Sequence, residues 1–254
     1  RASCSAGPRY RPRVARPALP CQHGTLLTIP KTTINHPLPK LTLQISEVIC
    51  QILRIPRVVA KTASSQDSVL VRIRTDNGLE GIGEADSSPE MVKAVIDAPF
   101  SHNIATGLRP LLIGQNPLET DRLWQSMYRK TMYAGRRSTT ITAMAAIDMA
   151  LWDLKGKHFG EPIHRLLGGK HHDKILAYAS ILFGKDGNET AKIARRWREF
   201  GYQAIKFGWE PMGQSEALDI DLVRGAREGI GDDGTLLIDA GCVWDARTAL
   251  SRAK

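Results

Sequence analysis

The sequence has no apolar run long enough to cross a membrane, and its cysteines are few and scattered. A membrane helix requires a run of ~18 apolar residues, and none of the apolar stretches approaches that length. Cys4, Cys21, Cys50 and Cys242 show no Cys-x-x-Cys spacing, which argues against a zinc ribbon or a disulfide framework. Cys50 and Cys242 stand in apolar, strand-like context and are expected to be small buried residues. A reducing, cytoplasmic setting fits this usage best.

Acidic residues are absent from the first 46 positions. That segment holds seven basic residues, and the remainder of the chain has 28 basic against 26 acidic residues. The formal net charge of +9 is therefore concentrated at one end, and the rest shows no basic stripe of the kind that binds nucleic acid. Seven of the fourteen prolines lie in residues 1–40, a density that forbids a continuous helix or a central strand. We expect residues 1–42 to be a disordered basic tail without a function in the mature protein.

Residues 43–170 are predicted to form an α+β domain that begins with a three-stranded meander. The strands are expected at residues 45–53, 69–75 and 79–85. A strong tight-turn signal, Asp76-Asn77-Gly78, lies between the second and the third strand. Gly81 and Gly83 indicate bulges or close packing in the third strand. The polar loop 58–66 is a candidate for ligand binding, although a plain surface connection is the commoner case.

Helical patterns follow the meander, at residues 89–98, 117–133, 138–155 and 162–167. The helix at 138–155 is apolar nearly all round, so it is predicted to be buried and to end at Gly156. Asp148 and Asp153 on this helix are expected to be hydrogen-bonded structural carboxylates.

Residues 171–254 change to alternating strands and helices. Strands are predicted at residues 175–181, 204–208 and 236–241, with centres about thirty residues apart, as in β/α units. Helices are predicted at 189–200, capped by Asn188 and with Phe200 facing inward, and at 215–228, with a last helix capped by Asp245. A closed barrel of eight such units needs ~250 residues by itself. We therefore expect only the first strands of a (β/α) barrel, in a chain truncated at its C-terminal end.

Two charged residues lie near the carboxyl ends of these strands. Lys206 is in the second strand and Asp239 is in the third. The carboxyl ends of parallel strands meet at one rim, which is where the chemistry of α/β folds takes place. The pattern alone favours a functional site and a structural ion pair about equally.

Three stretches resemble the mandelate racemase and muconate lactonizing enzyme group of the enolase superfamily. They are residues 145–157, reading AAIDMALWDLKGK, residues 160–169, reading GEPIHRLLGG, and residues 75–84, reading TDNGLEGIGE. The resemblance runs from about residue 43 to the end of the chain. It implies a capping domain followed by a barrel, and abstraction of the proton next to a carboxylate with Mg²⁺ as cofactor.

The resemblance also implies roles for the two rim residues. Asp239 matches the first metal ligand of the family, and Lys206 matches the first lysine of its Lys-x-Lys pair. The second lysine, which supplies the base in the family, is replaced by Gly208, and Gly241 stands where the family often has a polar residue. Lys206 would then orient the substrate carboxylate or act as the base from a shifted position. Alternatively, a histidine on a later strand would be the base, and two further glutamate ligands would lie beyond Lys254.

Several readings remain open. The implied substrate is a small carboxylate, and the missing lysine favours an acid-sugar dehydratase over a 2-hydroxy-acid racemase. The chain could also be a non-catalytic fragment, and the family allows a homo-oligomer. His171-His172 has no partner at metal-ligand spacing, so an exposed linker is the expected structure there.

Overall fold

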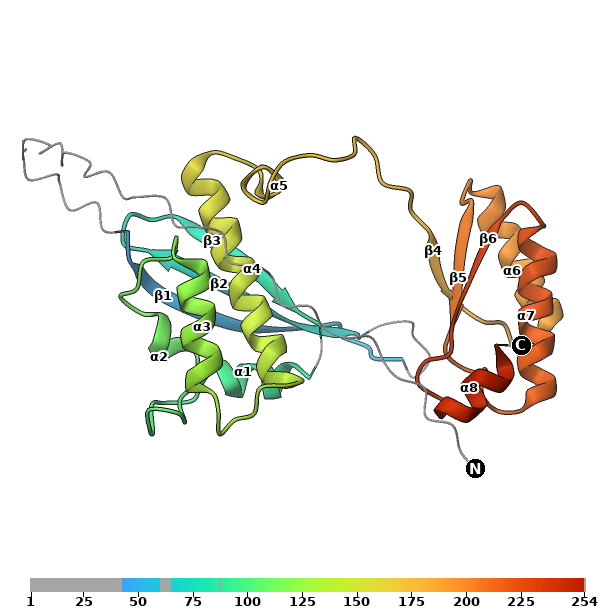
Figure 1. The fold of residues 1–254 in the computed structure, drawn as a ribbon, viewed down its shortest axis with the longest axis horizontal. Helices are drawn as coiled ribbons and strands as arrows, with labels where there is room; N and C mark the ends of the chain where they lie inside the picture. The colour runs from blue at the N-terminus through green and yellow to red at the C-terminus, as the bar shows by residue number, and fades with distance from the viewer. Residues whose placement is uncertain (1–42, 60–64, 87, 254) are drawn as a thin grey trace, which may run out of the picture. The chain divides into compact units, whose positions relative to one another are not determined.

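An antiparallel sheet of three strands opens the described part of the chain. The computed structural model describes residues 43–59, 65–86 and 88–253, so the predicted tail 1–42 and most of the loop 58–66 lie outside it. The strands are β1 (Ile45–Arg54), β2 (Asp67–Thr75) and β3 (Glu80–Ala85), in the order β1-β2-β3 (Figure 1). All three strands are found where the sequence predicts them.

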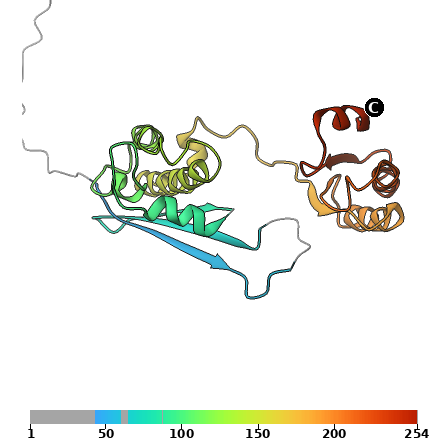
Figure 2. The same cartoon turned by 90° about the horizontal axis from the view of Figure 1, so that it is seen from below.

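Helices cover one face of this sheet, as the green and yellow-green elements in Figure 2 show. They are α1 (Pro89–Asp97), α2 (Arg109–Leu112), α3 (Thr120–Lys130), α4 (Thr139–Phe159) and α5 (Ile163–Leu166). Alternate residues of β2, namely Val69, Val71 and Ile73, are fully buried against these helices. This alternation is what a half-buried strand requires, because successive side chains point to opposite faces.

The glycines of β3 allow α4 to lie directly on the sheet. A Cβ atom at Gly83 would stand 1.9 Å from the carbonyl oxygen of Ala146, and one at Gly81 would stand 2.0 Å from that of Ala150. Neither distance is possible for a real side chain, so both positions need glycine at this spacing. The sequence predicts either bulges or close packing at these two glycines, and close packing is what occurs at both.

Two helix boundaries differ from the prediction. Helix α4 continues through Gly156 to Phe159 and ends at Gly160, whose φ is +65°. Gly156 is buried, and a Cβ atom there would lie 3.0 Å from the carbonyl oxygen of Glu161, so this glycine serves packing and not termination. Helix α3 begins at Thr120 because a turn around Asn116 precedes it, and the four-residue α2 is too short to show periodicity.

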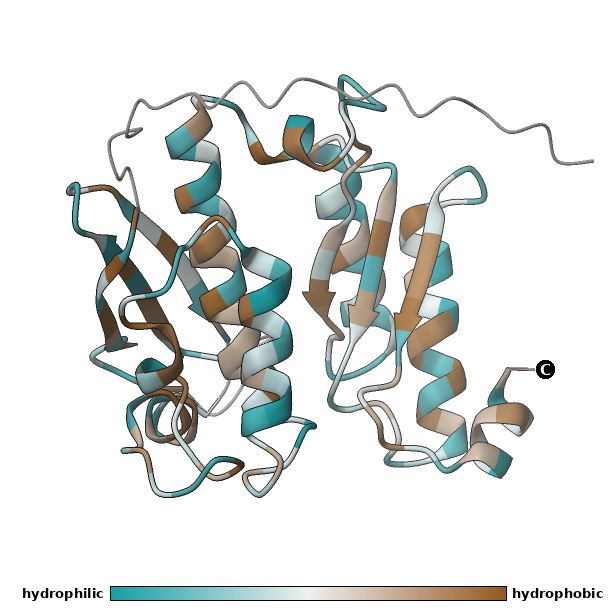
Figure 3. Cartoon of the chain, turned by 60° about the vertical axis from the view of Figure 1, so that its left-hand side comes forward, coloured by the Kyte–Doolittle hydropathy of each residue, from teal (hydrophilic) through white to brown (hydrophobic). Residues whose placement is uncertain are grey.

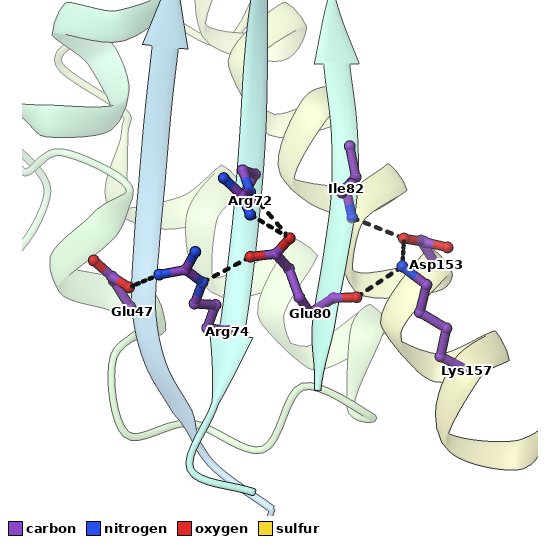
Figure 4. A network of polar contacts seen from close by, with 7 residues as sticks. All are labelled: Glu47, Arg72, Arg74, Glu80, Ile82, Asp153 and Lys157. Carbon is purple, nitrogen blue, oxygen red and sulfur yellow. Dashed lines mark hydrogen bonds and ion pairs between the residues drawn. The ribbon is translucent and has the colours of Figure 1, made fainter. Parts of the chain in front are cut away.

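A polar network runs from the other face of the sheet to helix α4 beside β3 (Figure 4). Arg72 and Arg74 both donate to Glu80, at 2.7 Å, and these hydrogen bonds hold the pKa of Glu80 below its usual range. Asp153 of α4 accepts from the backbone amide of Ile82 and from Lys157, both at 2.8 Å. The prediction of a structural carboxylate at Asp153 is therefore confirmed.

The second half of the described chain alternates strands with helices. Its elements are β4 (Ala179–Leu182), α6 (Gly187–Glu199), β5 (Ala204–Gly208), α7 (Glu216–Ile230), β6 (Thr235–Asp239) and α8 (Ala246–Arg252). The strands are parallel, in the order β4-β5-β6, as the three arrows in the right half of Figure 3 show. Ile205 and Phe207 of β5 pack with Leu222 and Ala226 of α7 in a separate hydrophobic cluster. Within the described residues, β4 and β6 each pair with β5 alone.

Four predictions for this half are wrong in detail. Strand β4 starts at Ala179, where its pairing with Ile205 of β5 begins, and Ile175 is 89% exposed. Asp186 caps α6 in place of Asn188, by accepting from the amide of Glu189 at 2.8 Å. Phe200 is exposed and does not face inward, and Cys242 is exposed and not buried. All four differences fall at or just outside the ends of elements, where a sequence pattern defines boundaries least well.

No helix among the described residues is long and apolar enough to cross a membrane.

Candidate functional site

Lys206 and Asp239 meet at the carboxyl end of the parallel sheet. Gly208 pairs with Asp239 in the register of β5 and β6, and Lys206 shares the face of Gly208 because it lies two residues earlier. This face is opposite to the one that packs on α7. The Nζ atom of Lys206 donates to Oδ2 of Asp239 at 3.0 Å. The sequence expectation that the two groups lie together is thus met.

The pair is open to solvent. The Lys206 side chain is 22% exposed and that of Asp239 is 39% exposed. A surface ion pair of this kind contributes at most about 1 kcal/mol to stability. A stabilising role is therefore a weak explanation for two opposite charges at this rim, and access for a small ligand is available.

Asp239 is held in a fixed orientation by two donors. Its Oδ1 accepts from the backbone amide of Gly241 at 3.0 Å, and its Oδ2 accepts from Lys206. These bonds, first that of Gly241 and then that of Lys206, hold the pKa of Asp239 below its usual value. Each oxygen of an ionised carboxylate has two lone pairs, so both oxygens keep room for a further cation or donor.

The absence of a side chain at position 208 has a steric reason. A Cβ atom at this position would lie 3.1 Å from both Cβ and the carbonyl oxygen of Asp239. Such a contact is tighter than side chains ordinarily make, so a lysine here would press on the carboxylate-bearing residue. Lys206 is consequently the cation that β5 supplies to Asp239.

Trp209 is a rim residue that the sequence reasoning missed. It follows β5 directly, has a φ of +67°, and is 45% exposed. Its ring stands where a side chain at position 241 would be, because a Cβ atom at Gly241 would lie 2.9 Å from Cε3 of the indole. A large aromatic residue immediately after a strand that carries a candidate site lysine is the signal that could have revealed it.

The described residues do not form a complete magnesium site. Mg²⁺ prefers several oxygen ligands in octahedral geometry. In the described ranges there is no group of three or more His, Cys, Asp or Glu residues that could hold a metal ion, and Asp239 supplies one carboxylate. His171 and His172 are exposed in the segment before β4, as predicted.

Comparison with known proteins assigns the family. Residues 42–168 match the N-terminal domain of mandelate racemase / muconate lactonizing enzyme, and residues 189–254 match the enolase C-terminal domain-like family. This chain belongs to the mandelate racemase and muconate lactonizing enzyme family. Its two sheets with their helices correspond to the capping domain and to part of the barrel of the enolase superfamily.

Family members of known activity include isomerases and lyases. The chain is 36% identical to D-galactarolactone cycloisomerase of Agrobacterium fabrum, over 68% of this chain and 43% of the relative. It is 34% identical to D-mannonate dehydratase of Novosphingobium aromaticivorans, over 75% of this chain and 44% of the relative. The chain thus spans less than half the length of these two relatives.

A solved structure shows the same fold. The crystal structure of a racemase from Streptomyces coelicolor with bound magnesium matches with a TM-score of 0.67 and 28% identity, over 82% of this chain and 58% of the racemase. A racemase with this arrangement of elements thus binds magnesium.

Proposed function

We propose that this chain carries part of the active site of an enzyme that abstracts the proton next to a carboxylate, and that the reaction is dehydration of an acid sugar. The observation that carries the proposal is the solvent-accessible contact between Lys206 and Asp239 at the rim. Dehydration is favoured over racemisation because Gly208 leaves β5 with a single lysine, and because a dehydratase of an acid sugar is among the relatives.

Lys206 has the role of binding the substrate carboxylate. Lys206 donates to Asp239, and an ammonium group at this rim attracts the anionic end of a substrate. It has three donors and uses one on Asp239, which leaves two N–H groups for the oxygens of a substrate. Two charge-assisted hydrogen bonds of this kind fix the orientation of a carboxylate and neutralise its charge.

Asp239 has the role of one oxygen ligand to Mg²⁺. A divalent cation stabilises the negative charge that develops on the substrate oxygens. The described residues do not complete its coordination, so the remaining ligands would come from residues outside them. The role given to Lys206 does not depend on the cation.

The test is an assay in D₂O with Mg²⁺ and a panel of acid sugars and 2-hydroxy acids. It uses this chain and, where the reading frame continues past codon 254, the longer protein as well. Dehydration releases water and gives a 2-keto-3-deoxy acid, which a carbonyl reagent detects by absorbance. Racemisation gives deuterium next to the carboxylate without loss of water, and would replace the dehydratase proposal.

The variants Lys206→Met and Asp239→Asn should each lower turnover by at least a hundredfold, the range that positioning and electrostatic groups contribute. Arg195→Met is the matched control, because Arg195 forms an exposed ion pair with Glu228 between α6 and α7. Equal activity of Lys206→Met and Arg195→Met would refute the role of Lys206. No product and no deuterium uptake in either protein would refute the enzymatic proposal, and would leave the non-catalytic reading.

A further inference from the structure

Trp209 stands at the rim in a conformation that the backbone rarely adopts. Its φ of +67° is in the left-handed region, where a bulky residue is uncommon and costs of order 1 kcal/mol. The residue is nevertheless 45% exposed, so burial does not compensate for this conformation in full. A large, strained and half-exposed aromatic residue beside Lys206 and Asp239 calls for a functional explanation.

The loop that carries the ring is anchored at both ends. The Trp209 amide donates to the carbonyl of Asp239 at 3.3 Å, and the Met212 amide donates to the carbonyl of Trp209 at 3.2 Å. Met212 is itself buried in the hydrophobic cluster. The Gly213 amide donates to Oδ1 of Asp219, a buried carboxylate of α7, at 2.7 Å. The indole is therefore presented by a fixed support before any ligand arrives.

The ring also touches the backbone that orients the carboxylate. The benzene half of the indole fills the space of a side chain at Gly241, with Cε3, Cζ3 and Cδ2 all within 3.5 Å of a Cβ atom built there. The amide of that same Gly241 donates to Oδ1 of Asp239. Lys206 reaches the other oxygen, Oδ2. Lys206 thus contacts one oxygen of the Asp239 carboxylate, and the amide that donates to the other oxygen belongs to the glycine against which Trp209 lies.

This arrangement gives a binding surface with a charged end and an apolar end. Small-molecule sites combine a few oriented polar groups with apolar and aromatic walls. A ligand that is held at Lys206 by its carboxylate touches Trp209 only if its carbon chain extends past Asp239. A two-carbon hydroxy acid has no carbon atoms beyond the carboxylate carbon and its neighbour, whereas a six-carbon acid sugar has four more.

We propose that Trp209 is a specificity-determining residue, whose exposed indole packs against the C–H groups of the carbon chain of a polyhydroxy acid bound at Lys206. This inference rests on the proposed function, since it takes the carboxylate site at Lys206 as given. Aromatic contacts of this size change affinity about three- to tenfold. The ring selects acids with a long carbon chain over short ones.

The experiment is an NMR titration of the 254-residue chain with D-gluconate and, separately, with glycolate. The Gly241 amide reports binding near Asp239, and the indole N–H signal of Trp209, assigned with Trp209→Phe, reports contact with the ring. Gluconate is expected to shift both signals, and glycolate only the first. Trp209→Ala should weaken the Kd of gluconate about three- to tenfold and leave that of glycolate unchanged, whereas Trp209→Phe should keep most of the affinity.

Phe200→Ala is the matched control, because Phe200 is an exposed aromatic residue at the end of α6 and should affect neither ligand. If Lys206→Met loses gluconate binding but Trp209→Ala keeps the Kd of the natural chain, this inference is overturned and the carboxylate site at Lys206 stands. Equal weakening of gluconate and glycolate in Trp209→Ala also overturns the inference. If neither acid shifts the Gly241 amide, or if Lys206→Met binds both as well as the natural chain does, the carboxylate site fails and the inference fails with it. Should Trp209→Ala not fold, the indole shift in the natural chain decides.

Discussion

Replacement of Gly83 by alanine should destabilise the protein through a clash that no side chain can relieve. The new Cβ atom would lie 1.9 Å from the carbonyl oxygen and 3.0 Å from the carbonyl carbon of Ala146, and 2.8 Å from the amide nitrogen of Ala150. All three are backbone atoms of α4. To reach an ordinary contact of about 3.4 Å or more, the helix must retreat from the sheet by more than an ångström.

The cost follows from the packing that this retreat disturbs. Insertion of one methyl group into a well-packed core costs about 1–3 kcal/mol, and the upper end applies because a rigid helix has to move. Alanine regains roughly 0.5–1 kcal/mol through its smaller loss of backbone freedom in the strand. The expected net loss in the free energy of unfolding is therefore about 2 kcal/mol. In a folded region of this size, that loss lowers the Tm by on the order of 8 °C.

Urea denaturation followed by far-ultraviolet circular dichroism measures this difference. The matched control is Ile82→Ala, because Ile82 lies between the two close-packed glycines but its side chain is 43% exposed. That control should lose less than about 1 kcal/mol. Gly81→Ala should behave like Gly83→Ala, since its Cβ atom would lie 2.0 Å from the carbonyl oxygen of Ala150.

A second variant separates a backbone clash from a side-chain clash. Ala146→Gly removes the methyl group of Ala146 but leaves its carbonyl oxygen in place, so it should not rescue Gly83→Ala. Rescue by this change, or a loss below about 0.5 kcal/mol for Gly83→Ala alone, would show that the helix is not held against the strand as described.

Three further outcomes are expected from the described contacts. NMR titration should find the pKa of Asp239 below its usual value, and Lys206→Met should raise it part of the way back, because the backbone amide two residues on still donates to it. The stability that this ionised carboxylate contributes is present above its unfolded pKa and is lost as the pH falls through the lower, folded pKa; a stability that rises on acidification would contradict this. Burial raises the pKa of the Cys50 thiol to about 11, so at pH 8 a thiol reagent should react with exposed Cys242 and not with Cys50. Cys242→Ser should therefore lower the number of fast-reacting thiols, whereas Cys50→Ser should leave that number unchanged. Asp186→Ala should cost about 1 kcal/mol in urea denaturation because it removes the N-cap of α6, and no change would show that the cap is dispensable.

Features with a strong period or a fixed spacing could be predicted from the sequence. The alternation in residues 69–75 and the turn signal at Gly78 define β2 and β3 almost to the residue. Lys206 and Asp239 could be brought together because parallel strands end at one rim, whatever their separation along the chain.

Features that depend on contacts across the fold could not be predicted. Gly156 looks like a helix terminator in the sequence, but its role is to let the chain after α4 pass close by. The position of Trp209 depends on the missing side chain at Gly241, which lies on another strand end. The neighbour of Gly156 lies beyond the end of its own helix, and Gly241 is on a different β/α unit from Trp209, so local propensity gives no information about either contact.

The parallel sheet also determines how this chain behaves at high concentration. Its outer strand β6 presents backbone amides and carbonyls along an edge that no other described strand covers, beside half-exposed Leu237 and Ile238. Such an edge is a template on which another extended chain can pair. A preparation of these 254 residues should therefore remain monodisperse only when dilute, and a lysine in place of Leu237 should extend the range of soluble concentrations.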